Sequence, residues 1–199
     1  VANTLLGRHD AEAQLTLDEI RIPESELRRV DKIIVVACGT AFYAGLVAKY
    51  AIEHWTRIPC EVELASEFRY RDPLVDARTL CVAVSQSGET ADTLGALREA
   101  KVRGARTMAI CNVVGSAIAR EADDVLYTHA GPEIGVASTK AFTTQVVGHY
   151  LMALRLAIAR GRLSRDDARA RIGELMRLPR LVEKTLLLDE AVRAVAQKD

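Results

Sequence analysis

The chain has 199 residues, of which 49% are apolar, so it can bury the core of one domain with a helical extension. Its 27 basic and 27 acidic side chains balance, which gives no electrostatic reason to expect a nucleic-acid partner. No apolar run approaches the ~18 residues that cross a bilayer, and the first ten residues lack the apolar stretch of a signal peptide. The chain begins with Val1 rather than Met, which suggests a fragment of a longer protein.

The first 30 residues are polar and mixed in charge, with one short helix expected near 23–29. From Asp31 onward, strands are predicted at 32–37, 59–64, 80–84, 106–111 and 124–128. Helices are predicted between them and after them, at 41–57, 90–102, 116–121 and 138–160. This alternation predicts an α/β fold, a three-layer α-β-α sandwich with a five-stranded parallel sheet.

Residues 161–199 are predicted to form a helical extension without a further strand. Ser164 begins it in a pattern similar to a capping box, Pro179 is expected to interrupt it, and 186–196 is amphipathic. The chain therefore divides into a lead-in segment at 1–30, a ligand-binding domain at 31–160 and a helical connector at 161–199.

The four cysteines indicate a reducing compartment rather than a disulfide framework. They are far apart, with no C-x-x-C pair and no histidine at metal-binding spacing. Cys60, Cys81 and Cys111 lie in or beside apolar runs and are expected to be buried thiols. Because no targeting signal is visible either, we expect a cytoplasmic protein without a metal site.

The strongest candidate binding site is the turn at 85–90, which follows the central predicted strand and leads directly into a helix. Ligands of open parallel sheets bind beyond the carboxyl ends of the strands, and the first amides of a helix attract anions. Gly88 is expected to let the backbone approach a ligand closely, and the other donors come from Ser85, Gln86, Ser87 and Thr90. The cluster predicts a phosphate cradle without a cationic side chain, although a capped helix start is the simpler alternative.

Two further turns lie between a strand and a helix. The first contains Cys38, Gly39 and Thr40, and either contacts a ligand or forms only a tight turn; no base beside Cys38 suggests a nucleophile. The second is the loop 131–140, which either closes over a ligand or only starts the long helix.

Within that loop, Gly135 suggests unusual backbone geometry, and Ser138 occupies the position of a helix cap. A closed loop would offer the ligand the backbone of Val136 and Ala137 and the hydroxyl of Ser138. Lys140 is interpreted as a structural or interface residue.

Other charged residues are weaker candidates. Glu89 is favoured in the first turn of a helix by the dipole alone, but could also face the ligand. The segment 67–71 is either a subunit contact or a short solvated helix. His54 is interpreted as a surface or packing residue, and no histidine is expected to bind a ligand.

These motifs resemble a known family. The turn at 85–90 is similar to the phosphate-binding motif of sugar isomerase (SIS) domains. The whole chain resembles, more specifically, the first SIS domain of the glucosamine-6-phosphate synthase family, on the segments 38–40, 65–71, 85–94 and 133–143. Those enzymes are glutamine–fructose-6-phosphate aminotransferases (isomerizing), which have a glutaminase domain followed by two SIS domains. They convert fructose 6-phosphate and glutamine to glucosamine 6-phosphate and glutamate in hexosamine biosynthesis.

The resemblance also implies the roles of individual residues. It assigns the sugar phosphate to Ser85, Gln86, Ser87 and Thr90, one side of the sugar to Cys38, Gly39 and Thr40, and its hydroxyls to Val136, Ala137 and Ser138. Ala41 departs from the family, where serine is frequent, so a side-chain contact is lost at that position.

By the same resemblance, this chain carries no catalytic residue and needs no cofactor. The acid/base and the Schiff-base lysine belong to the second SIS domain, and the nucleophilic cysteine belongs to the glutaminase domain. We therefore expect the fragment alone to bind sugar phosphate weakly or not at all, and to be inactive. A homodimer is expected by analogy.

Two alternatives remain open. SIS domains also sense sugar phosphates in transcription regulators, but such a protein should carry a basic recognition helix, and the sequence shows none. A separate SIS isomerase or deglycase would need a catalytic glutamate or histidine within this chain, and no candidate stands out.

Overall fold

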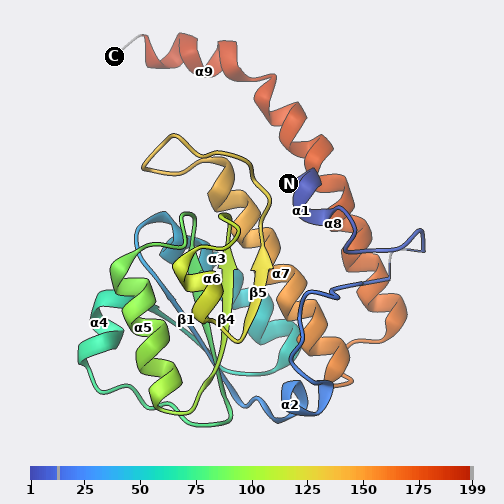
Figure 1. Cartoon of the computed structure of the whole chain (residues 1–199). Helices are drawn as coiled ribbons and strands as arrows, with labels where there is room; N and C mark the ends of the chain where they lie inside the picture. Colours follow the sequence, from blue (N-terminus) through green and yellow to red (C-terminus); the bar gives the residue numbers. More distant parts are fainter. Residues whose placement is uncertain (13, 198–199) are drawn as a thin grey trace.

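The computed structural model describes residues 1–12 and 14–197, and its centre is a five-stranded sheet (Figure 1). The strand order is β2-β1-β3-β4-β5, and every neighbouring pair is parallel. The strands are β1 (Lys32–Ala37), β2 (Cys60–Leu64), β3 (Thr79–Ser85), β4 (Arg106–Cys111) and β5 (Asp124–Tyr127). The predicted α/β fold with five parallel strands is confirmed.

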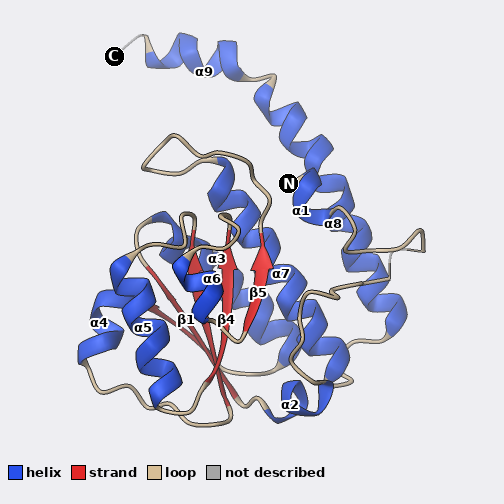
Figure 2. Ribbon diagram, in the orientation of Figure 1, coloured by secondary structure: helices blue, strands red, loops and turns tan. Residues whose placement is uncertain are grey.

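Helices cover both faces of the sheet (Figure 2). One face carries α3 (Thr40–Thr56) and α7 (Lys140–Ala159), and the other carries α4 (Ala65–Tyr70), α5 (Ala91–Val102) and α6 (Ala117–Glu121). The remaining helices are α1 (Ala2–Leu5), α2 (Glu24–Arg29), α8 (Arg165–Leu186) and α9 (Asp189–Ala196). Among the described helices, none is both long enough and apolar enough to cross a membrane.

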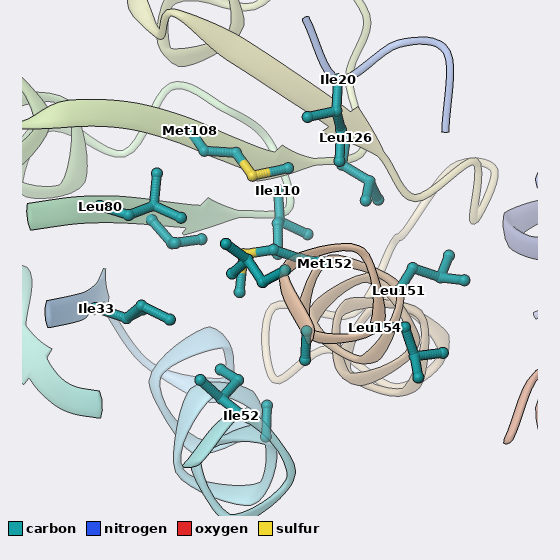
Figure 3. Close-up of a cluster of buried hydrophobic side chains, with 14 of the residues drawn as sticks. Ile20, Ile33, Ile52, Leu80, Met108, Ile110, Leu126, Leu151, Met152 and Leu154 are labelled. Atoms are coloured by element: carbon teal, nitrogen blue, oxygen red, sulfur yellow. The ribbon is translucent and has the colours of Figure 1, made fainter. Parts of the chain in front are cut away.

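The sheet divides the apolar residues into two cores, because successive side chains of a strand point to opposite faces. In β1, Ile33 and Val35 belong to the larger core, which the side chains of α3 and α7 complete (Figure 3). Ile34 and Val36 belong to the smaller core, where Phe68 of α4 is fully buried. Burial on both faces explains why the strands read as nearly continuous apolar runs.

The N-terminal segment packs onto the larger core rather than standing apart from it. Leu5, Leu17 and Ile20 are buried there. Arg8 is only 5% exposed: its guanidinium donates to the carbonyl oxygen of Tyr127 at 2.6 Å and to Glu19 at 2.6 Å. These contacts attach the N-terminal segment to the end of β5. The division of the chain into three parts at residues 30 and 160 stays a prediction.

Several predicted boundaries differ from the structure. The prediction that Pro179 interrupts the C-terminal helix is wrong, because α8 continues through it to Leu186. A proline removes one N–H donor, while the turns on either side keep their own hydrogen bonds. The predicted helix start at Ser138 is also wrong: α7 begins at Lys140 with Thr139 as the N-cap residue. The short helix α1 was not expected.

Ser164 behaves as the sequence indicated. Its Oγ accepts a hydrogen bond from the amide of Asp167 at 3.0 Å, and donates to the Asp167 carboxylate at 2.7 Å. This reciprocal pair satisfies one of the free amides at the start of α8.

Candidate functional site

The candidate site lies where the chain changes direction within the sheet. From β1 the chain moves outward to β2, whereas β3, β4 and β5 follow on the other side of β1. The loops after β1 and β3 therefore diverge and leave a crevice at the carboxyl ends of two neighbouring strands. Such a topological switch point is the usual ligand site of an open parallel sheet.

An open cavity of about 470 Å³ occupies this crevice. The three turns singled out in the sequence all contribute to its wall. Eight of the ten predicted site residues line it, namely Cys38, Gly39, Thr40, Gln86, Ser87, Thr90, Val136 and Ser138. The other lining residues are Ala41, Glu133, Ile134, Gly135 and Gln145. No lysine or arginine belongs to the described lining, so the cavity wall is neutral except for Glu133.

The hydroxyl of Ser85 acts within the turn. Ser85 is 3% exposed and lies outside the cavity wall; its Oγ accepts from the amide of Gly88 at 3.0 Å and is paired with Thr90 Oγ1 at 3.0 Å. Ser87 Oγ accepts from the amide of Glu89 at 3.2 Å. These bonds curl the turn into a cradle, so Ser85 shapes the turn from behind the surface.

The start of α5 supplies the donors of the cradle. Thr90 is the N-cap residue, and within residues 1–12 and 14–197 no side chain caps this helix. The first amides of a helix have no partner within it and carry partial positive charge, so they are free to bind an anion. A phosphate at this place needs no cationic side chain.

Gly88 and Glu89 have structural roles that the sequence did not separate from ligand binding. Gly88 has φ +67°, and a Cβ there would lie 1.9 Å from Ser116 Oγ, so the close approach is to the residue before α6. Glu89 Oε1 accepts from the amide of Ala117 at 2.8 Å and thus caps α6. Glu89 does not line the cavity.

Cys38 is half-buried at the cavity wall, where its Sγ accepts a weak hydrogen bond from Thr93 Oγ1 at 3.9 Å. The other three cysteines are buried thiols, as predicted. Burial raises the pKa of Cys60 and of Cys81 to about 12, and that of Cys111 to about 11, so these three side chains stay protonated at neutral pH.

The loop between β5 and α7 is held at both ends. At its start, Asn112 accepts from the amide of Ala130 at 2.7 Å and donates to the carbonyl of Gly131 at 2.8 Å. At its end, Glu133 Oε2 accepts from the amides of Thr139 and Ala141 at 3.1 and 3.2 Å. These amides lower the pKa of the Glu133 carboxyl, because they stabilise its charged form.

Between these anchors, the tip of the loop stands open. Ile134 and Val136 are fully solvent-exposed, and Ala137 is exposed outside the cavity wall. The unusual backbone that the sequence suggested at Gly135 occurs instead at Ser138, which has φ +45°. Ser138 does not cap α7, whose N-cap residue is Thr139. The hydroxyl of Ser138 is buried without a partner among the described residues.

Gln145 is the lining residue that sequence reasoning missed. It lies in α7 and is 2% exposed, yet it reaches the cavity. A single polar residue within a mainly apolar helix was the only available signal, and such a residue is equally common on an exposed face. No group of three potential ligands for a metal occurs in the described residues.

Comparison with known proteins agrees with this geometry. The profile of the SIS domain family matches residues 26–155. Glutamine–fructose-6-phosphate aminotransferases (isomerizing) from Streptomyces coelicolor and Corynebacterium diphtheriae are 62% and 59% identical over 99% of this chain, and the chain spans about a third (32%) of their length.

Among solved structures, the C-terminal domain of the Francisella tularensis glucosamine-fructose-6-phosphate aminotransferase has a TM-score of 0.92 and 41% identity, covering 98% of this chain and 55% of that one. The Thermotoga maritima glucosamine-6-phosphate deaminase shares the fold, with a TM-score of 0.61 and 21% identity over 86% of this chain and 51% of that one. Since the family profile covers most of the chain, including all three turns of the cavity, this protein belongs to the SIS domain family.

Proposed function

We propose that this chain is the first SIS domain of a glutamine–fructose-6-phosphate aminotransferase (isomerizing), and that it binds the sugar phosphate on which that enzyme acts. The observation that carries the proposal is the cavity at the switch point, where a helix N-terminus meets a turn rich in hydroxyls and amides. The high identity to such aminotransferases supports the choice of enzyme within the SIS family.

In this proposal the phosphate lies at the start of α5. The free backbone amides at the start of α5 and the side chains of Gln86, Ser87 and Thr90 donate to its oxygens, while Ser85 holds the turn in shape. Because the charge is balanced by dipoles and amides rather than by a lysine, the site binds a phosphate without holding it as a tight ion pair.

The sugar then extends from the phosphate toward the other two turns. Cys38, Gly39 and Thr40 form one side of its compartment. Val136 and Ser138 come from the loop 131–139, which covers the hydroxyls of the sugar; Ala137 contributes if the loop closes further than it does here. Fructose 6-phosphate is the ligand that the similarity to aminotransferases favours.

The chemistry of the reaction is proposed to occur with residues outside this chain. Isomerisation needs an acid/base, and amination benefits from a lysine that forms a Schiff base; a second SIS domain and a glutaminase domain would supply these groups and the ammonia. Residues 161–199 would connect to that second SIS domain. We further propose a cytoplasmic enzyme whose subunits form a homodimer.

Removing donors from the cradle tests the proposal in the full-length protein that carries this chain. Ser87→Ala combined with Thr90→Val should raise the KM for fructose 6-phosphate by about a hundredfold or more, because each lost hydrogen bond to a charged group contributes roughly 1.5–3 kcal/mol. Ser25→Ala is the matched control, since Ser25 is an exposed residue of α2 that does not line the cavity. An unchanged KM in the double variant would refute the proposal.

A further inference from the structure

Gln145 has an oxygen that the protein itself leaves without a partner. The side chain is 2% exposed, and its Oε1 is fully buried with no hydrogen-bond donor among the residues that the structure describes. The backbone carbonyl of the same residue is occupied, since it accepts from His149 Nδ1 at 2.7 Å. Only the carboxamide is therefore available for a further contact.

A second buried oxygen without a hydrogen-bond partner lies in a residue that lines the same cavity. In residues 1–12 and 14–197, the buried side-chain oxygens without a partner are Ser138 Oγ and Gln145 Oε1, and both residues line the cavity at the switch point. A buried polar atom costs free energy unless it is hydrogen-bonded, so such atoms are usually paired. Two of them on one cavity wall leave hydrogen-bonding capacity that a group from outside the chain, such as a bound ligand, can use.

The turn at the start of α5 and the Gln145 carboxamide offer different hydrogen-bonding groups to a ligand. The turn at the start of α5 presents amide and hydroxyl donors, which suit the oxygens of a phosphate. A carboxamide oxygen can only accept, so it does not suit a phosphate dianion but does suit the hydroxyl of a sugar. Gln145 comes from α7, which packs against α3, whose first residues Thr40 and Ala41 line the same cavity.

We propose that Gln145 is a specificity-determining residue of the cavity, whose Oε1 accepts a hydrogen bond from a hydroxyl of the bound sugar phosphate. The inference rests on the proposed function and adds to it the group that distinguishes a sugar phosphate from a phosphate alone. His149 supports this role, because its bond to the Gln145 carbonyl fixes the turn of α7 that carries the amide.

The test is Gln145→Met in the full-length protein that carries this chain. Methionine has a similar length but no comparable acceptor, so the affinity for fructose 6-phosphate measured by calorimetry should fall about tenfold, the value of one hydrogen bond. The affinity for inorganic phosphate should not change. The thermal midpoint of the unliganded protein should stay the same or rise, because no internal hydrogen bond is lost.

Thr144→Val is the matched control. Thr144 is the buried neighbour in α7, and its hydroxyl is satisfied by the carbonyl of Ala141 at 3.0 Å, so this variant should bind fructose 6-phosphate as the wild type does. The role of Gln145 is overturned if the Gln145→Met variant keeps wild-type affinity for fructose 6-phosphate, or if its affinity for inorganic phosphate falls by the same factor. It is also overturned if the unliganded variant has a thermal midpoint several degrees lower. Failure of the wild type to bind fructose 6-phosphate would instead overturn the proposed function, and the inference with it.

Discussion

At the scale of single residues, Gly88 is the position where the turn at 85–90 tolerates no side chain. Two independent constraints meet there: φ is +67°, a conformation that costs a residue with a Cβ free energy, and Ser116 Oγ occupies the space of that Cβ. Since Ser116 is itself buried at the start of α6, it cannot move away easily. The packing of this turn against the start of α6 therefore requires a residue without a Cβ at position 88.

Gly88→Ala should lower the free energy of unfolding by roughly 2–4 kcal/mol, as the sum of backbone strain and overpacking. Gly104→Ala is the control, because Gly104 also has positive φ, +88°, but nothing lies within 4 Å of its Cβ position. That variant should cost only the strain, about 1 kcal/mol. Urea unfolding of both variants measures the difference, and equal losses would show that Ser116 gives way.

His149 is a second residue whose environment makes a measurable prediction. Its imidazole is fully buried in α7, and burial lowers its pKa to about 4. Because a carbonyl only accepts, Nδ1 carries the proton in the bond to Gln145, and Nε2 is left without a partner among the described residues. The folded protein therefore holds this ring neutral.

The unfolded chain binds a proton at His149 near pH 6.5, whereas the folded chain does so only near pH 4. The stability that the folded state gains from keeping His149 neutral is thus fully present above pH 6.5. It decreases as the pH falls toward 4, by on the order of 3 kcal/mol in total. His149→Gln should flatten this part of the curve of unfolding free energy against pH. His54→Gln, at an exposed position, should leave it as steep as in the wild type; an equally steep curve for His149→Gln would contradict the prediction.

At the scale of elements, the start of α7 depends on a carboxylate from the loop that precedes it. The amides of Thr139 and Ala141 both donate to Glu133, in place of a side-chain cap from Thr139. The Glu133 carboxylate thereby satisfies two amides at the start of α7 and fixes the open loop beside the cavity. The loop is positioned by the helix that it leads into.

Because these amides lower the pKa of Glu133, the contact is present above the ordinary pKa of a glutamate and is lost as the pH falls through the lower folded value. In a titration followed by NMR, the amide shifts of Thr139 and Ala141 should therefore change below about pH 4.3. Glu133→Gln should abolish that change and weaken fructose 6-phosphate binding, while Glu174→Gln, an exposed residue of α8, should do neither. A midpoint near pH 4.3 or above for these amide shifts would contradict the bonding of Glu133 to the two amides.

At the scale of the whole molecule, the C-terminal helices carry apolar residues that this chain leaves uncovered. In α8 the last buried residue is Leu175, and Leu181 and Leu186 are exposed. No residue of α9 is buried, although Val192 and Val195 give it an apolar side; the helix extends away from the sheet (Figure 1). This agrees with the proposal that 161–199 connects to a further domain.

The proposed division of labour predicts that the 199-residue chain alone makes no glucosamine 6-phosphate. Among the residues that the structure describes, the cavity wall offers a single carboxylate, Glu133, which is already bound to two amides, and no lysine. A coupled assay with fructose 6-phosphate and glutamine should show no product from this chain, whereas the full-length protein should give product under the same conditions. Turnover by the chain alone would refute the assignment of the reaction to other domains.

The sequence by itself determined the five strands, the helices between them and their order along the chain. Strands buried on both faces read as apolar runs, and the predicted limits of β1 and β4 agree with the structure to the residue. The turn at 85–90 could be found because its polar residues are contiguous and lie at a strand end. Resemblance of four segments then indicated the SIS family, and the family profile confirms it.

Only the tertiary structure decided which residues face the cavity and which serve the fold. Ser85, Glu89 and Gln145 differ in this respect from what their positions in the chain suggest. Ser85 bonds to Gly88 and Thr90 within its own turn, whereas Glu89 is oriented by a contact with a distant segment and Gln145 is carried by a distant helix. Glu89 bonds to Ala117 at the start of α6, 28 residues away. Gln145 reaches the cavity from α7, which begins at Lys140, whereas the helix next to the cradle begins at Ala91. Local sequence patterns report propensity and periodicity, but they do not report such long-range contacts.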